Sequence, residues 1–239
     1  MALNQHQLAR KYPYPILSPG NLVDTFRTGK GPSLERPDND ELAVGWDARD
    51  SLRGNFVQIF QTMERIQKNV RLTAGAQAIE IGNEVRKRME SALTVADVAR
   101  QRLKDMQERT ATRVEMTLRP PHSYMAALLP ELRAHLRSLT ETKRYDLVAK
   151  ESNGADALVY LHAIAGAPPA LSGIAPGRHA ELRDMLLAVK DPSLLGMEAG
   201  FERELQLLER AAKGFEEQIR DHVNFEMADE LRKLSDGTA

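Results

Sequence analysis

Cysteine is absent from this chain of 239 residues, and aromatic residues and net charge are both scarce. Without cysteine the chain can form neither disulfides nor thiolate metal sites, and its absence fits a reducing compartment. Aromatic residues make up only 5% of the chain, and alanine and leucine carry most of the apolar content, which favours helices over sheets. Lys and Arg number 33 against 34 Asp and Glu, so the whole-chain charge indicates neither nucleic acid nor a membrane as partner.

The sequence also lacks the motifs of common catalytic and metal sites. No two of the six histidines are three or four residues apart and no Glu-x-x-His occurs, so helical zinc and di-iron sites lack their spacing. Residues 29–31 resemble the end of a phosphate loop without its Ser or Thr, and residues 179–181 match only half of a zinc-deaminase signature. We therefore predict no catalytic residues, no metal ligands, no cofactor and no enzymatic activity.

The chain is organised around residues 51–118, which read as one very long amphipathic helix or as two helices joined end to end. Apolar residues recur at alternating steps of four and three, the a/d seam of a heptad repeat. Unbroken, this stretch would be roughly 100 Å long, more than a compact domain needs. We predict that the seam packs against other chains in an oligomer. The seam residues of the first half are Leu52, Phe56, Ile59, Met63, Ile66 and Val70.

Two positions inside this stretch are candidate breaks. Glycine costs about 1 kcal/mol relative to alanine in a helix interior, and Gly75 lies in an Ala-Gly-Ala run. Thr94 and Asp97 resemble a capping box with Asp in place of Glu. The pattern leaves open whether the helix breaks near Gly75 or near Thr94. The prolines at positions 120 and 121 end the element.

Residues 1–45 are predicted to form an extended arm. Prolines and glycines recur throughout, and residues before proline avoid the helical region. The first residues also lack the apolar core of a signal peptide, so we expect no secretion by that route. The prediction is that the arm docks on a partner surface. Its apolar anchors are Tyr12, Tyr14, Ile16, Leu17 and Phe26.

Residues 120–239 predict a helical bundle that ends in one long helix over residues 196–233. An apolar stripe runs along that helix at steps of three and four. An alternative to the oligomer is that this stripe folds back onto the seam within one chain. Residues 157–177 carry no charged side chain, but prolines and glycines interrupt them, so we predict a buried segment and no membrane span.

These patterns together predict an all-α protein with an extended arm (1–45), a long central helix (46–119) and a C-terminal bundle (120–239). The function that they favour is that of a non-enzymatic structural or assembly protein. It would act through coiled-coil and arm contacts, with copies of itself and with other protein subunits. A large particle, such as a virion capsid, neck or tail, fits this layout. The expected location is the cytoplasm or a virus-like particle.

The alternative function is a nucleic-acid-binding or packaging accessory protein. Residues 86–150 hold 14 Arg and Lys against 8 Asp and Glu, but few aromatic residues lie among them for base stacking. Nucleic acid is therefore the less favoured partner. The contacts in this alternative would be Arg86, Lys87, Arg88, Arg100, Arg102 and Lys104.

Overall fold

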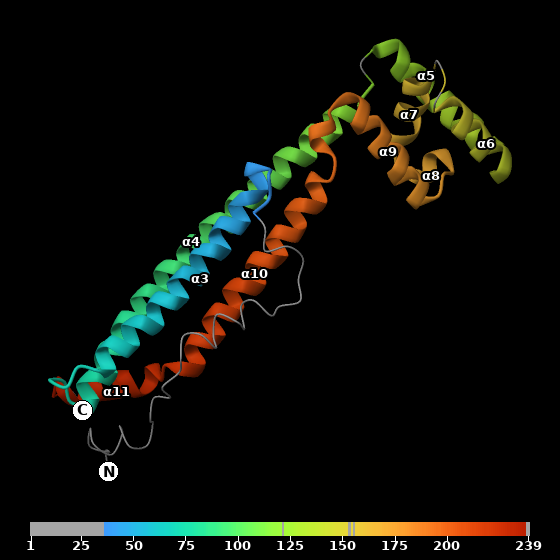
Figure 1. Cartoon of the computed structure of the whole chain (residues 1–239). Coiled ribbons are helices and arrows are strands. Elements are labelled where there is room, and N and C mark those ends of the chain that lie inside the picture. The colour runs from blue at the N-terminus through green and yellow to red at the C-terminus, as the bar shows by residue number, and fades with distance from the viewer. Residues whose placement is uncertain (1–35, 121, 153, 155, 238–239) are drawn as a thin grey trace. The chain divides into compact units, whose positions relative to one another are not determined.

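The computed structural model describes residues 36–120, 122–152, 154 and 156–237. Every regular element in these residues is a helix, which confirms the predicted all-α fold (Figure 1). The described residues divide into two units, one formed by residues 36–104 and 203–237, and one by the described residues of 105–202. The helices are α3 (Asp40–Gln67), α4 (Ala74–Leu118), α5 (Ser123–Ser138), α6 (Glu141–Glu151), α7 (Ala157–Ala165), α8 (Pro169–Ser172), α9 (Pro176–Lys190), η1 (Pro192–Leu194), α10 (Met197–His222) and α11 (Phe225–Ser235).

The predicted central helix over residues 46–119 is wrong, because the chain reverses between α3 and α4. Arg88 donates to Gln58 at 3.1 Å, and Gln77 donates to the backbone oxygen of Gln67 at 3.2 Å. Later residues of α4 thus contact earlier residues of α3, which is the pattern of an antiparallel pair. The first half of the seam therefore faces the second half across a hairpin instead of extending it.

The break falls at residues 68–73, close to Gly75 and far from Thr94, and polar side chains in these residues explain its position. The Asn69 side chain accepts from the backbone N–H of Arg71 at 3.1 Å, and the Thr73 hydroxyl accepts from Ala76 at 3.2 Å. Such bonds satisfy the backbone groups that a helix end leaves unpaired. Gly75 and Thr94 both lie within α4.

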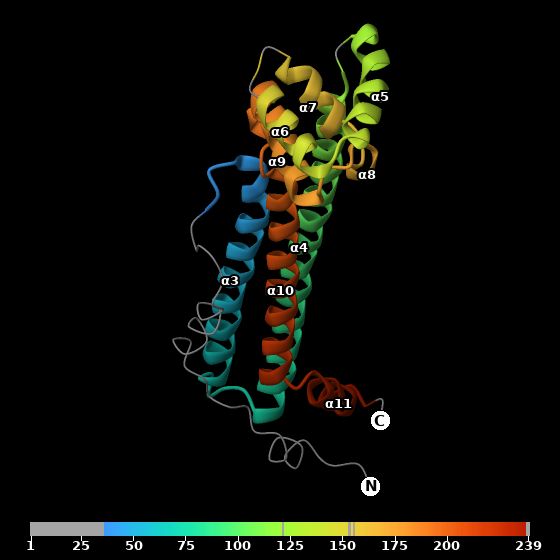
Figure 2. The same cartoon turned by 90° about the vertical axis from the view of Figure 1, so that its right-hand side faces the viewer.

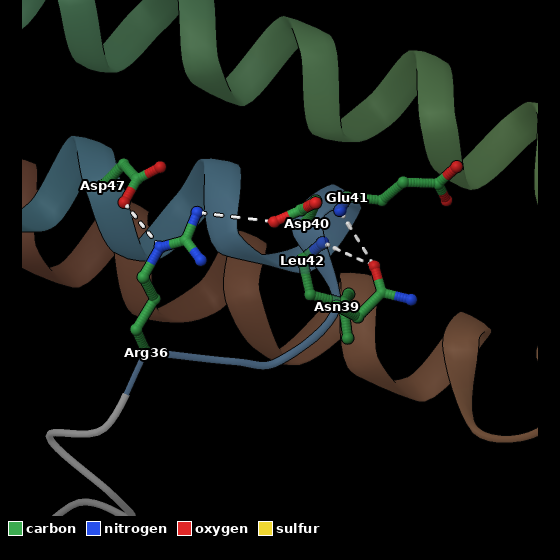
Figure 3. A network of polar contacts seen from close by, with 6 residues as sticks. All are labelled: Arg36, Asn39, Asp40, Glu41, Leu42 and Asp47. Carbon is green, nitrogen blue, oxygen red and sulfur yellow. Dashed lines mark hydrogen bonds and ion pairs between the residues drawn. The ribbon is translucent and has the colours of Figure 1, made fainter.

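The helix α3 starts at Asp40, so residues 40–45, which were assigned to the arm, belong to it. Its N-cap is Asn39, whose side-chain oxygen accepts from the N–H groups of Glu41 at 2.8 Å and Leu42 at 3.3 Å (Figure 3). Arg36 reaches forward to Asp47 at 3.2 Å. An Asn followed by acidic residues is a helix-start signal, but the sequence analysis included these residues in the extended arm.

In the first unit, α3 and the adjoining parts of α4 and α10 lie side by side (Figures 1 and 2). The Phe56 ring of α3 lies 6.2 Å from the Phe215 ring of α10, and Phe60 meets His222 edge-on at 5.5 Å. The predicted single helix over residues 196–233 is wrong, because α10 ends at His222 and α11 begins at Phe225. Asn224 caps α11 by accepting from Met227 at 2.9 Å.

The second unit has a core in which α7 is central. It contacts α5, α6, α8 and α9. Arg144 of α6 ties two helix ends together, because its guanidinium donates to the backbone oxygens of Leu136 at 2.8 Å and Leu139 at 3.0 Å at the end of α5, and of Gly173 after α8. Side-chain donors of this kind help to satisfy the carbonyl groups that helix ends leave without intrahelical partners. The core residues are Leu136, Val148, Leu161, Ile164, Ala165, Ile174, Leu182 and Leu186.

Candidate interaction surface

The residues predicted to form an oligomer seam form the core of a single chain. Five of the six, all except Val70, are buried within the chain itself. The Phe56 contact with Phe215 shows that the C-terminal stripe folds back onto this face. The prediction of an intermolecular seam is thereby corrected, since no face of these five side chains is left for another chain. Val70 lies in the turn after α3 and is 95% exposed, so it belongs to no seam.

Half of the basic residues proposed for nucleic-acid contacts are already engaged within the chain. Arg86 donates to Asp229, Arg88 donates to Gln58, and Arg100 pairs with Asp97 at 2.8 Å. The hydrogen bond to Asp229 raises the pKa of Arg86. The other three, Lys87, Arg102 and Lys104, are exposed on α4. The arrangement therefore presents fewer cations to a phosphate backbone than the sequence indicated.

The five arm anchors, at positions 12, 14, 16, 17 and 26, lie outside the described residues. The prediction that the arm docks on a partner surface therefore remains a prediction.

The uncharged segment of residues 157–177 is buried only in part, so the sequence prediction holds for its middle alone. Residues 161–165, 172 and 174 are buried, whereas residues 158, 166, 168, 170, 171 and 175–177 are exposed. Leu161, Ile164 and Ile174 belong to the core of the second unit. His162 is buried with them, and its Nδ1 lies 3.0 Å from the backbone oxygen of Leu118, so Nδ1 donates to that oxygen. Burial lowers the pKa of His162, which keeps the imidazole neutral.

An ion pair between α3 and α10 in the first unit is mostly buried. Arg49 donates to Glu204 at 2.9 Å, and burial lowers the pKa of Arg49 and raises that of Glu204. A Cβ at Gly45 would lie 2.8 Å from the Glu204 carboxylate, so glycine leaves the room that this side chain occupies. The pair lies against a packed helix face, and its geometry indicates a structural contact.

The most prominent exposed apolar feature of the second unit lies on α5. Tyr124 is 65% exposed and Leu128 is 49% exposed, and they are four residues apart on one helix face. The exposed Ala127 lies between them, and the ring of His122 stacks on Tyr124 with centroids 5.7 Å apart. No charged residue occurs in residues 120–130. We call Tyr124, Ala127 and Leu128 the α5 face.

Sequence reasoning missed the α5 face. It predicted a helical bundle over residues 120–239 without assigning which side chains of this helix are exposed. The signal was present, because a helix segment without charge that carries a tyrosine and a leucine outside the core stripe is unusual for a solvated surface.

Comparisons with known proteins returned no matching family model, no matching curated protein and no matching solved structure. Among the residues that the structure describes, no helix is long and apolar enough to cross a bilayer. The same residues contain no group of three His, Asp or Glu side chains placed to hold a metal ion.

Proposed function

We propose that this protein is a non-enzymatic helical assembly protein, which works through contacts with other protein chains in an oligomer or a large particle. The observation that supports the proposal is the α5 face. Single exposed apolar residues are common, but neighbouring Tyr and Leu side chains in an uncharged segment resemble the charge-depleted core of a protein interface.

A partner chain that covers the α5 face would remove apolar surface from water, which is favourable. Covering the exposed parts of Tyr124 and Leu128 would contribute roughly 1 kcal/mol for each side chain, since part of each is already buried. Tyrosine adds a hydroxyl that can hydrogen-bond at the edge of an interface while its ring is buried. The face therefore combines the residue types that interfaces favour, on a rigid helix held by α7 and α8.

The experiment compares the mass in solution of the wild type and of Leu128→Glu by sedimentation equilibrium. The wild type should form an oligomer, and Leu128→Glu should weaken it by at least about tenfold, since a charge would have to be desolvated in the interface. At concentrations low enough for both proteins to be single chains, the melting temperature should be the same, because Leu128 is exposed within one chain.

Val189→Glu is the matched control, because Val189 is 63% exposed in the same unit and lies on α9. It should change neither mass nor melting temperature. A wild type with the mass of a single chain over the whole concentration range would contradict self-assembly. Equal weakening by both substitutions would contradict the assignment to the α5 face.

A further inference from the structure

The last helix, α11, docks on α4 at a position shaped to receive it. A Cβ at Gly82 would lie 2.6 Å from the Cβ of Ala228, so the two helices approach closely only because residue 82 is glycine. Ala78 packs with Met227 and Leu231 in a small cluster beside this crossing. The fit is thus specific to this pair of helix faces, and both belong to the first unit.

A polar interaction sets the register of the same crossing. Arg86 donates to both carboxylate oxygens of Asp229, at 3.1 and 2.7 Å, and its guanidinium lies 5.3 Å from the centroid of the Phe225 ring. A two-pronged Arg–carboxylate interaction demands a defined geometry as well as opposite charges. Any chain that presents the α11 sequence to the α4 face could make these interactions.

The junction that turns α11 onto α4 is short and conflicts with the local sequence pattern. Only Val223 and Asn224 separate α10 from α11. The apolar stripe nevertheless continues across the junction at steps of four, and all of its members are buried: Phe215, Ile219, Val223, Met227 and Leu231. This spacing predicts one uninterrupted helix. The side chain of Asn224, which caps α11, holds the break in place.

We infer that α10 and α11 can join into one continuous helix, and that α11 then docks on the α4 of a second copy, whose α11 docks in return. The two chains then make between them the same interactions that α11 makes within one chain, so the exchange requires no new complementary surface. The spacing of the apolar residues favours one continuous helix, whereas the Asn224 cap favours two separate helices. The inference builds on the proposed assembly function by naming a second copy as partner, but it does not use the α5 face.

The first test is Asn224→Ala, which removes the cap and favours a continuous helix. Loss of an N-cap weakens the broken form about fivefold for each chain, so the dimerisation constant should rise roughly 25-fold. Light scattering measures the mass, and circular dichroism checks that helix content does not fall. A monomer with reduced helix content would mean that α11 merely frays, and would overturn the inference.

The second test identifies the exchange itself by a charge swap in the Asn224→Ala background. In the Arg86→Glu variant the new carboxylate lies beside Asp229 of the same chain. In the Asp229→Arg variant the new guanidinium lies beside Arg86 of the same chain. Each variant therefore places two like charges between α4 and α11. In a mixed dimer of the two variants, the substituted position 86 of one copy meets the substituted position 229 of the other with opposite charges. The remaining pair is the native Arg86 and Asp229. Mixed dimers should form roughly tenfold more tightly than dimers of either variant alone.

The double variant with both substitutions in one chain is the control, since it restores the pair with its charges reversed and should behave as its parent. The side chains of Arg86 and Asp229 are partly exposed, so the single variants are expected to fold. Mixtures with no preference for mixed dimers would overturn the exchange. That result would leave the α5 face untouched, because Leu128→Glu tests it separately.

Discussion

Gly45 and Gly54 both lie on α3, but their surroundings predict opposite effects of a methyl group. Alanine at position 45 would press against Glu204 and Leu103 and should destabilise the protein by about 1–3 kcal/mol. A Cβ at Gly54 would meet no atom within 4 Å beyond its own helix turn, so alanine there should stabilise the helix by about 0.5–1 kcal/mol. Urea denaturation of the two variants measures both effects. A stable Gly45→Ala would mean that α3 and α10 do not pack closely.

His162 should make the stability of the second unit depend on pH. Its Nε2 is buried without a hydrogen-bond partner, and burial, with a smaller contribution from Lys190, lowers its pKa. The folded state therefore binds a proton less readily than the unfolded state, whose histidine has a pKa near 6.5. Stability should be complete above that pH and fall below it, by up to about 1.4 kcal/mol per pH unit.

Replacing the histidine by glutamine provides the comparison for this effect. The free energy of unfolding of the wild type and His162→Gln should be measured near neutral pH and about two units below it. The wild type should lose more stability than the variant on acidification. An equal loss in both would show that the imidazole is not the group that takes up the proton.

At the scale of the element, the hairpin of α3 and α4 changes the expected effect of a charge in the seam. Ile59→Asp should unfold the single chain instead of dissociating an oligomer, because Ile59 is fully buried within it. We expect a loss of about 3–5 kcal/mol, the cost of a buried unpaired charge. Val70→Asp should change stability by less than about 0.5 kcal/mol, because Val70 is exposed in the turn.

Thermal unfolding followed by circular dichroism measures this pair of variants. A folded Ile59→Asp with reduced mass would restore the oligomer seam, contrary to the intramolecular packing. A large loss of stability in Val70→Asp would show that position 70 has a partner in solution.

At the scale of the whole molecule, a truncation series separates the arm from the helical body. Deletion of residues 2–35 should leave the helix content of the body unchanged, since α3 and its cap remain. Deletion of residues 2–40 also removes the cap Asn39 and the ion pair of Arg36, and should cost about 1 kcal/mol more. If the arm docks on a partner, both deletions should weaken assembly alike.

Melting temperature and sedimentation measure the two properties on the same samples. Unfolding of the shorter deletion would show that residues 2–35 contribute to the core of the body. Unchanged assembly in both deletions would contradict the predicted docking of the arm.

The sequence alone determined the helical class and the apolar stripes. Both follow from local rules, since a stripe at steps of three and four requires only that one face of a helix be buried. Burial of the whole uncharged segment of residues 157–177 was predicted for the same reason, but only part of it, including Leu161 and Ile164, lies in the core. The Asn39 and Asn224 caps could also have been predicted from local rules, but the sequence analysis did not identify them.

Only the tertiary structure decided which apolar stripe packs against which other stripe. Phe56 and Ile59 could pack equally well against a second chain or against Phe215 of the same chain. Apolar interactions are non-directional, so the spacing of apolar residues does not determine which surface covers them. The reversal at residues 68–73 settled that choice in favour of the same chain. The exposed α5 face and the docking of α11 against Gly82 likewise depend on neighbours that are distant in sequence, and no local pattern specifies those.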